Sequence, residues 1–147
     1  MIKVAIIGAT GIVGQQAIVT LTNHPWFQIT KLAASARSAG KTYGEALREA
    51  NGASRWWCPE ELPASVAQLP VENAADFDPT TVDLIFSTLD AGVAKELEPK
   101  WAQTTPVVST ASAFRYEDDT PILIGGVNMD HAALIKVQQE RRGWKGF

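Results

Sequence analysis

Residues 4–14 combine an apolar run with three evenly spaced glycines. Val4-Ala5-Ile6-Ile7 is followed directly by Gly8-Ala9-Thr10-Gly11-Ile12-Val13-Gly14. The apolar run predicts a buried strand, and the residues after the glycine turn have a helical pattern. A strand that enters a tight turn and then a helix directs the N–H groups of the turn and the helix N-terminus toward one point. This arrangement suits an anion such as a diphosphate.

Each glycine of this turn has its own expected role. Gly8 permits the turn, Gly11 lets a ligand approach the backbone, and Gly14 lets the helix and the strand pack closely. The spacing G-x-x-G-x-x-G differs by one residue from the commonest dinucleotide-binding pattern. Its place between a strand and a helix favours dinucleotide binding over a turn that serves packing alone.

Apolar runs alternate with helical patterns along the rest of the chain, which predicts an α/β fold. We expect a doubly wound, mostly parallel sheet of the Rossmann type with helices on both faces. The expected strands are 2–8, 29–34, 82–87, 107–108 and 122–124. The expected helices are 11–22, 45–50, 91–103 with a kink or break at Pro99, and a last helix from the N-cap Asn128 to Gly143. Residues 51–70 are expected to be irregular, with one helical turn at most.

Composition limits the classes of partner. The chain has 147 residues, which suits one domain, and its formal net charge is −3 without a basic block. The charge pattern therefore speaks against nucleic acid or a membrane surface as a partner. One cysteine cannot form an internal disulfide, and no apolar run approaches a membrane span. We expect a cytoplasmic protein without a metal site.

The residues after the second strand indicate which nucleotide fits. A site for NAD usually carries an acid there, roughly 20 residues beyond the glycines, whereas an arginine suits the 2′-phosphate of NADP. This chain has Ser35-Ala36-Arg37-Ser38 and no acid. A guanidinium and two hydroxyls are suited to a dianionic phosphate, so the sequence favours NADP over NAD, the alternative being an ordinary solvated loop.

Several stretches together resemble the archaeal and fungal type of aspartate-semialdehyde dehydrogenase. The most specific are Ala111-Ser112-Ala113-Phe114-Arg115 and the closing run Gln139-Glu140-Arg141-Arg142-Gly143-Trp144-Lys145-Gly146-Phe147. Others are Gly8 to Gly14, His24 to Phe27, Ala33 to Lys41 with Tyr43-Gly44-Glu45, Val82 to Thr88, and Val127-Asn128 with Asp130-His131. The resemblance covers essentially the whole chain. Enzymes of this type reduce aspartyl phosphate to the semialdehyde with NADPH, through a thioester on a catalytic cysteine, in amino-acid biosynthesis.

The resemblance implies a role for each matching residue. Thr10, Gly11, Ile12 and Val13, together with Gly8, belong to the diphosphate loop, and Ser35, Arg37 and Ser38 hold the 2′-phosphate. Ser87 and Thr88 lie near the ribose and the nicotinamide, and Arg115 helps to bind the phosphate of the substrate. From the residues alone, a surface ion pair of Arg115 with Glu117, Asp118 or Asp119 is an equal alternative.

The chain departs from the family pattern in its catalytic groups. The family cysteine and histidine lie beyond the position of Phe147, so we expect no catalytic residue in this chain. Cys58 belongs to an irregular segment and is expected to be an inert, partly buried thiol, and His24 and His131 are expected to be structural. Thr110 and Gly125-Gly126 replace residues usual in the family, which puts fine positioning of the substrate in doubt.

These observations predict that residues 1–147 form one NADP-binding domain, with the catalytic and dimerisation domain absent from this chain. The chain alone is expected to be inactive, and the complete enzyme to act on a small-molecule substrate. Two alternatives stay open: a malonyl-CoA reductase domain, and a non-catalytic NADP-binding sensor module. Phe114 favours the dehydrogenase over the reductase. The oligomeric state is open, with a homo-oligomer as one option.

Overall fold

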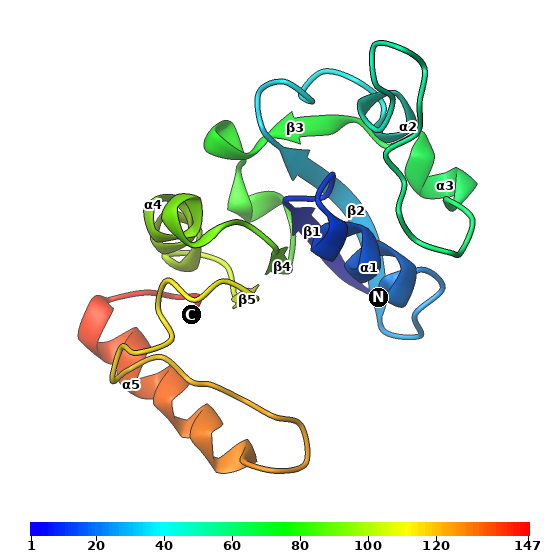
Figure 1. Ribbon diagram of the computed structural model, residues 1–147. Helices are drawn as coiled ribbons and strands as arrows, with labels where there is room; N and C mark the ends of the chain where they lie inside the picture. Colours follow the sequence, from blue (N-terminus) through cyan, green and yellow to red (C-terminus); the bar gives the residue numbers. More distant parts are fainter.

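A parallel sheet of five strands runs through the centre of the computed structural model, which describes residues 1–147 (Figure 1). The strand order is β3-β2-β1-β4-β5, and every neighbouring pair is parallel. The bounds are β1 Ile2–Ile7, β2 Phe27–Ala34, β3 Val71–Asn73, β4 Leu84–Ser87 and β5 Val107–Ser109. The predicted α/β architecture is confirmed.

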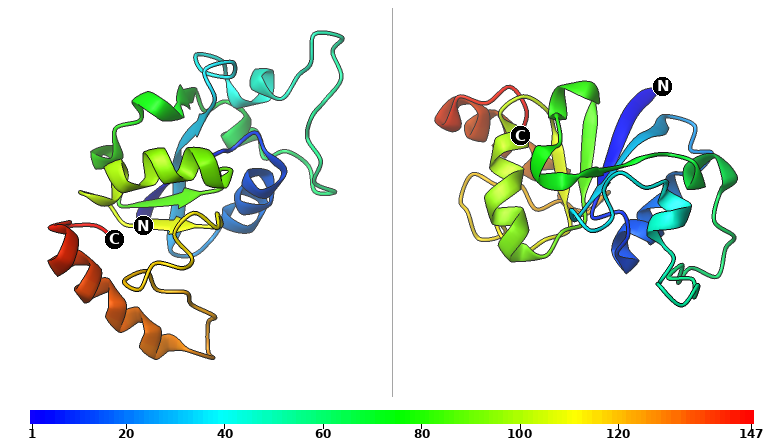
Figure 2. Two further views of the ribbon diagram at one scale, coloured as in Figure 1. Left: turned by 60° about the vertical axis from the view of Figure 1, so that its left-hand side comes forward. Right: turned by 90° about the horizontal axis from the view of Figure 1, so that it is seen from above.

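Helices cover both faces of this sheet (Figure 2). The α-helices are α1 Ile12–Leu21, α2 Tyr43–Ala46, α3 Ala64–Ala67, α4 Ala91–Ala102 and α5 Leu134–Arg142. Three short 3-10 helices are η1 Ala74–Asp76, η2 Pro79–Thr81 and η3 Met129–Ala133. One apolar cluster joins the sheet to α1, α2 and α3, and a second joins it to α4. None of the helices combines the length and the apolar character needed to cross a membrane.

The central strand β1 is covered on both faces, which explains why its sequence is apolar without alternation. Val4 and Ile6 pack in the cluster with α1, whereas Ala5 and Ile7 pack in the cluster with α4. All four residues are fully buried. Since successive side chains of a strand point to opposite faces, a strand covered on both sides needs apolar residues at every position.

The predicted strand at 122–124 is wrong. These residues form no strand, and Ile122, Leu123 and Ile124 are all exposed. Their backbone groups bond instead to side chains near η3: Ile124 N–H donates to Asn128 Oδ1, and Asn128 Nδ2 donates to the carbonyl oxygen of Ile122. The last helix, predicted to run from the N-cap Asn128 to Gly143, is divided into η3 and α5, and the side chain of Asn128 makes no capping hydrogen bond to η3.

Three other expectations about elements are corrected. The strand β3 was not expected, because Val71 is its only apolar residue and its pairing with β2 decides its conformation. The helix predicted at 45–50 lies instead at Tyr43–Ala46 as α2, which begins earlier because Thr42 and Glu45 form a capping box. The helix α4 continues without a break through Pro99, because Leu97 and Trp101 are anchored in the core on either side.

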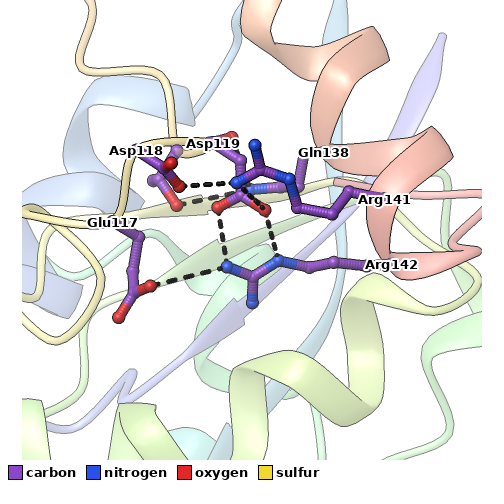
Figure 3. Close-up of polar contacts among 7 residues, drawn as sticks. Glu117, Asp118, Asp119, Gln138, Arg141 and Arg142 are labelled. Carbon is purple, nitrogen blue, oxygen red and sulfur yellow. Dashed lines mark hydrogen bonds and ion pairs between the residues drawn. The ribbon is translucent and has the colours of Figure 1, made fainter.

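Residues 110–147 form an arm that extends from the sheet and carries α5 (Figure 1). Its acidic and basic side chains meet in the cluster drawn in Figure 3. Asp119, with 1% of its side chain exposed, accepts two hydrogen bonds from Arg142, at 2.6 and 2.7 Å. These hydrogen bonds, with the positive charges of Arg142 and Arg141, hold the pKa of Asp119 below its ordinary value despite burial. Hence the Asp119 carboxylate fastens α5 to the preceding loop.

The ion pair of Asp119 predicts how the stability of α5 depends on pH. A carboxyl group whose pKa is lower in the folded state stabilises that state above its unfolded pKa of about 4 and loses this contribution as the pH falls through the folded value. At pH 7, Asp119→Asn should reduce protection of the α5 amides from hydrogen exchange by roughly 30-fold, or about 2 kcal/mol. The difference from wild type should shrink below about pH 4.

Asp118→Asn is the matched control for this measurement, because 80% of the Asp118 side chain is exposed and its pair with Arg141 is screened by solvent. Its effect on α5 protection should be small at every pH. Equal effects of the two substitutions at pH 7 would contradict the assigned role of Asp119.

Candidate functional site

The glycine turn lies between the carboxyl end of β1 and the first residue of α1. Gly8 has φ of +85°, and an added Cβ would lie 2.7 Å from Thr88 Oγ1 and 2.8 Å from the carbonyl oxygen of Thr88. A Cβ on Gly14 would meet the carbonyl oxygen of Gly8 and lie 2.8 Å from the Cα of Ala9. Gly8 thus allows the turn, and Gly14 allows the close approach of helix and strand, which agrees with the roles predicted from the spacing.

All three carbonyl groups at the start of this turn are occupied within the protein. The carbonyl oxygens of Gly8, Ala9 and Thr10 accept hydrogen bonds from Gly11 N–H at 3.0 Å, Tyr43 Oη at 2.6 Å and Gln15 Nε2 at 3.1 Å, respectively. By contrast, the N–H groups of Thr10, Ile12 and Val13 have no acceptor in the protein. Since the side chains of Ile12 and Val13 are exposed, the turn offers free donors at the N-terminus of α1.

The segment after β2 lies beside this turn. The N–H groups of Gly8 and Ala9 both donate to the carbonyl oxygen of Ala33, at 2.9 and 3.1 Å. Ser35 and Arg37 follow β2 directly, and both are exposed. The guanidinium of Arg37 forms no ion pair. Ser38 is 3% exposed, so little of its hydroxyl group faces the surface. The unpaired guanidinium of Arg37 thus follows β2, whose carboxyl end is hydrogen-bonded to the glycine turn through Ala33.

The end of β4 borders the turn on its other side. Thr88 donates from both N–H and Oγ1 to the carbonyl oxygen of Ile7, at 2.9 and 2.8 Å. Ser87 is fully buried, and its hydroxyl group has no hydrogen-bond partner. β1 pairs with β2 on one side and with β4 on the other. The strands β2 and β3 are thus added on one side of β1, and β4 and β5 on the other, which makes the end of β1 the point where the strand order reverses. Open α/β sheets bind ligands at such a position.

A separate cavity of about 430 Å³ lies between α4, β5 and the arm. Its lining includes Glu98, Val107, Phe114, Arg115 and Phe147, and none of the residues of the glycine turn. The cavity is largely apolar, whereas the turn presents backbone donors at a helix N-terminus. On chemical grounds, the turn rather than this cavity suits a diphosphate.

Residues 3–135 match the family described as semialdehyde dehydrogenase, NAD binding domain. The chain belongs to this family. An aspartate-semialdehyde dehydrogenase of Methanothermobacter thermautotrophicus is 47% identical over 147 residues, which are 100% of this chain and 40% of the relative. A malonyl CoA reductase (NADP) of Metallosphaera sedula is 37% identical over 99% of this chain and 39% of its own length.

The fold of this family domain matches solved structures. The aspartate semialdehyde dehydrogenase of Candida albicans, crystallised with NADP, superposes with a TM-score of 0.83 at 34% identity, covering 96% of this chain and 38% of that chain. The present chain therefore spans about 40% of the length of its curated relatives.

Arg115 does not form the surface ion pair that its acidic neighbours suggested. Asp118 and Glu117 pair with Arg141 and Arg142 of α5 instead, at 2.6 and 3.8 Å. Asp119 is likewise bound to Arg142. Arg115 is exposed, makes no ion pair and borders the apolar cavity. The ion-pair alternative is thus wrong, because α5 brings two better placed arginines to the acids.

The only cysteine has the environment of an inert thiol. Cys58 is 8% exposed and accepts a hydrogen bond from Gln16 Nε2 at 3.2 Å. Burial, and then the negative charge of Glu60, raise the pKa of this thiol above its ordinary value. A buried thiol with a raised pKa is a poor nucleophile, because the thiolate is the reactive form.

We expect Cys58 to react with iodoacetamide at pH 7 at least 10-fold more slowly in the native chain than in the chain unfolded in urea. Mass spectrometry at timed intervals measures both rates. Equal rates would show that the native thiol is accessible and ionised, contrary to its burial beside Gln16.

Both histidines make local contacts. His24 stacks on Phe27 with ring centroids 4.9 Å apart, and its Nδ1 accepts from the N–H of Trp26. His131 Nδ1 lies 3.0 Å from the N–H of Ile122. These contacts fit the structural roles expected for both.

Sequence reasoning missed two residues that support the turn. Tyr43 and Gln15 are fully buried and bond to its carbonyl oxygens. Gln15 directly follows the third glycine, and Tyr43 follows the capping residue Thr42. The capping box was a readable signal for the start of α2, but no local pattern indicates that the tyrosine hydroxyl reaches the turn.

Proposed function

We propose that the chain is the NADP-binding domain of an aspartate-semialdehyde dehydrogenase. The observation that carries this proposal is the 47% identity to such an enzyme across all 147 residues. The crystallisation of a structural relative with NADP supports the choice of nucleotide, as does the absence of an acid from Ser35-Ala36-Arg37-Ser38.

The nucleotide is bound at the carboxyl end of the neighbouring strands β1 and β4. The free N–H groups of Thr10, Ile12 and Val13 donate hydrogen bonds to the diphosphate, which approaches closely because Gly11 has no side chain. Arg37, assisted by Ser35 and Ser38, recognises the 2′-phosphate. Ser87 and Thr88 contact the ribose and the nicotinamide, and the unpartnered hydroxyl of Ser87 is free to take part in this contact.

The reaction of the complete enzyme is the reduction of aspartyl phosphate to its semialdehyde, with release of phosphate. NADPH supplies the hydride when bound. Arg115, exposed and free of ion pairs, attracts the phosphate of the substrate. The nucleophile and the acid/base group come from the remaining part of such an enzyme, because Cys58 is buried and both histidines make local contacts. The chain by itself therefore binds the nucleotide without turnover.

A second candidate is the corresponding domain of a malonyl-CoA reductase. The 37% identity to such an enzyme over 99% of this chain favours it, although the identity is lower than to the dehydrogenase. In either case we propose a cytoplasmic enzyme that acts on a small molecule. Its net charge of −3 disfavours nucleic acid as a partner.

Titration of the isolated chain with NADPH and NADH tests the binding proposal. Energy transfer from tryptophan to the bound nicotinamide reports saturation, and NADPH should bind at least 10-fold more tightly than NADH. Equal or tighter binding of NADH would contradict the role of Arg37.

To identify the substrate, the chain joined to the catalytic part of the Methanothermobacter relative is assayed with aspartate semialdehyde and malonate semialdehyde. Activity only with malonate semialdehyde would favour the second candidate.

A further inference from the structure

The hydroxyl group of Tyr43 determines the orientation of one peptide unit in the glycine turn. Tyr43 Oη donates to the carbonyl oxygen of Ala9 at 2.6 Å, although the two residues are 34 positions apart in sequence. Tyr43 is fully buried, and this is its only side-chain hydrogen bond. The C=O of Ala9 and the N–H of Thr10 belong to the same planar trans peptide and point in opposite directions. Holding this carbonyl group toward the core therefore turns the N–H of Thr10 away from it.

Gln15 holds the next peptide unit in the same way. Its Nε2 donates to the carbonyl oxygens of Thr10 at 3.1 Å and of Arg55 at 2.8 Å, and its Oε1 accepts from the N–H of Trp57 at 2.7 Å. Both ends of a fully buried amide are thus bonded, which fixes the side chain. Two buried side chains that were not part of the predicted site, Tyr43 and Gln15, therefore fix the carbonyl groups of the turn on its core side.

We propose that Tyr43 is a positioning residue for binding of the diphosphate, with Gln15 as its helper; the inference rests on the proposed function. Tyr43 does not contact the ligand. Its hydroxyl group keeps the carbonyl of Ala9 away from the anion and the N–H of Thr10 toward it. Without that hydrogen bond, the peptide unit is free to rotate, and a carbonyl oxygen facing the diphosphate repels it.

A purely structural role of Tyr43 makes a different prediction. Phenylalanine keeps the ring and its packing in the apolar cluster that joins the sheet to α1, α2 and α3, so packing alone predicts that a folded Tyr43→Phe chain binds every ligand normally. The positioning role predicts a loss confined to ligands that carry the diphosphate. The two roles are distinguished by the affinity for a ligand with the diphosphate relative to that for a ligand without it, and not by the stability of the variant.

The experiment measures binding of NADPH and of adenosine 2′-monophosphate by calorimetry to the wild-type chain and to Tyr43→Phe. Adenosine 2′-monophosphate keeps the phosphate proposed for Arg37 and lacks the diphosphate. We expect Tyr43→Phe to weaken NADPH about 10-fold and to change binding of the monophosphate less than twofold. Tyr116→Phe is the matched control, because Tyr116 is 95% exposed and should leave both affinities unchanged.

Gln15→Met provides a second variant if Tyr43→Phe does not fold. It removes the hydrogen bond to the carbonyl oxygen of Thr10 and should weaken NADPH about 5-fold, again without effect on the monophosphate. Unchanged NADPH affinity in the folded variants, or equal losses for both ligands, would overturn the inference while leaving the proposed function intact. A wild-type chain that binds neither ligand would overturn both.

Discussion

Gly8→Ala should lower the free energy of unfolding of the chain by about 3 to 5 kcal/mol and abolish nucleotide binding. Two costs combine at this position. The φ of +85° is strained for alanine, and the new Cβ would lie 2.7 and 2.8 Å from atoms of Thr88, one of them a backbone oxygen. Thr88 cannot yield easily, because its N–H and hydroxyl groups are bonded to Ile7. Urea denaturation measures the stability, and calorimetry measures the binding.

Gly40→Ala separates the two costs. Gly40 has nearly the same φ, at +81°, but nothing lies within 4 Å of an added Cβ. It should therefore cost only the backbone strain, about 1 to 2 kcal/mol, and leave the turn unaltered. If Gly8→Ala cost no more than Gly40→Ala, the packing of the turn against Thr88 would be refuted.

Arg37→Ala should weaken NADPH binding about 30-fold and leave NADH binding within about twofold of wild type. The guanidinium is the only charged group of Ser35-Ala36-Arg37-Ser38, and it has no partner in the protein to lose. Its removal should therefore affect the 2′-phosphate without destabilising the fold. Because the site is exposed to solvent, the loss should diminish as the salt concentration rises.

Arg48→Ala is the control for this substitution. Arg48 is exposed and also free of ion pairs, but it lies near the end of α2 rather than after β2. It tests whether any lost positive charge weakens the binding of a polyanion. Equal losses in the two variants would remove the argument for a specific 2′-phosphate contact at Arg37.

The sequence predicted those parts of the fold in which local pattern and tertiary structure agree. Val4 to Ile7 are apolar because the strand is covered on both faces, and Gly8 and Gly14 occupy positions that a side chain cannot fill. Ile122 to Ile124 have an equally strand-like composition, yet they pair with no strand. The Asn128 side chain instead forms hydrogen bonds with the N–H of Ile124 and the carbonyl oxygen of Ile122. An apolar run indicates a strand only where a partner strand is present.

The support of the site depended on contacts between distant parts of the chain. Tyr43 reaches the carbonyl oxygen of Ala9 across 34 positions, and Gln15 reaches the carbonyl oxygen of Arg55 across 40 positions. The pairing of Asp118 and Asp119 with the arginines of α5, in place of Arg115, is likewise a tertiary effect, since both arginines lie more than 20 positions from these acids. Local periodicity carries no information about such contacts.

A crystal structure of the chain with NADPH tests the central claim most directly. We expect the diphosphate within hydrogen-bond distance of the N–H groups of Thr10, Ile12 and Val13, and the 2′-phosphate bound by the guanidinium of Arg37. The carbonyl of Ala9 should stay bonded to Tyr43. A nucleotide bound elsewhere, for example in the cavity beside α4, or an Arg37 side chain directed into solvent away from the nucleotide, would contradict the account.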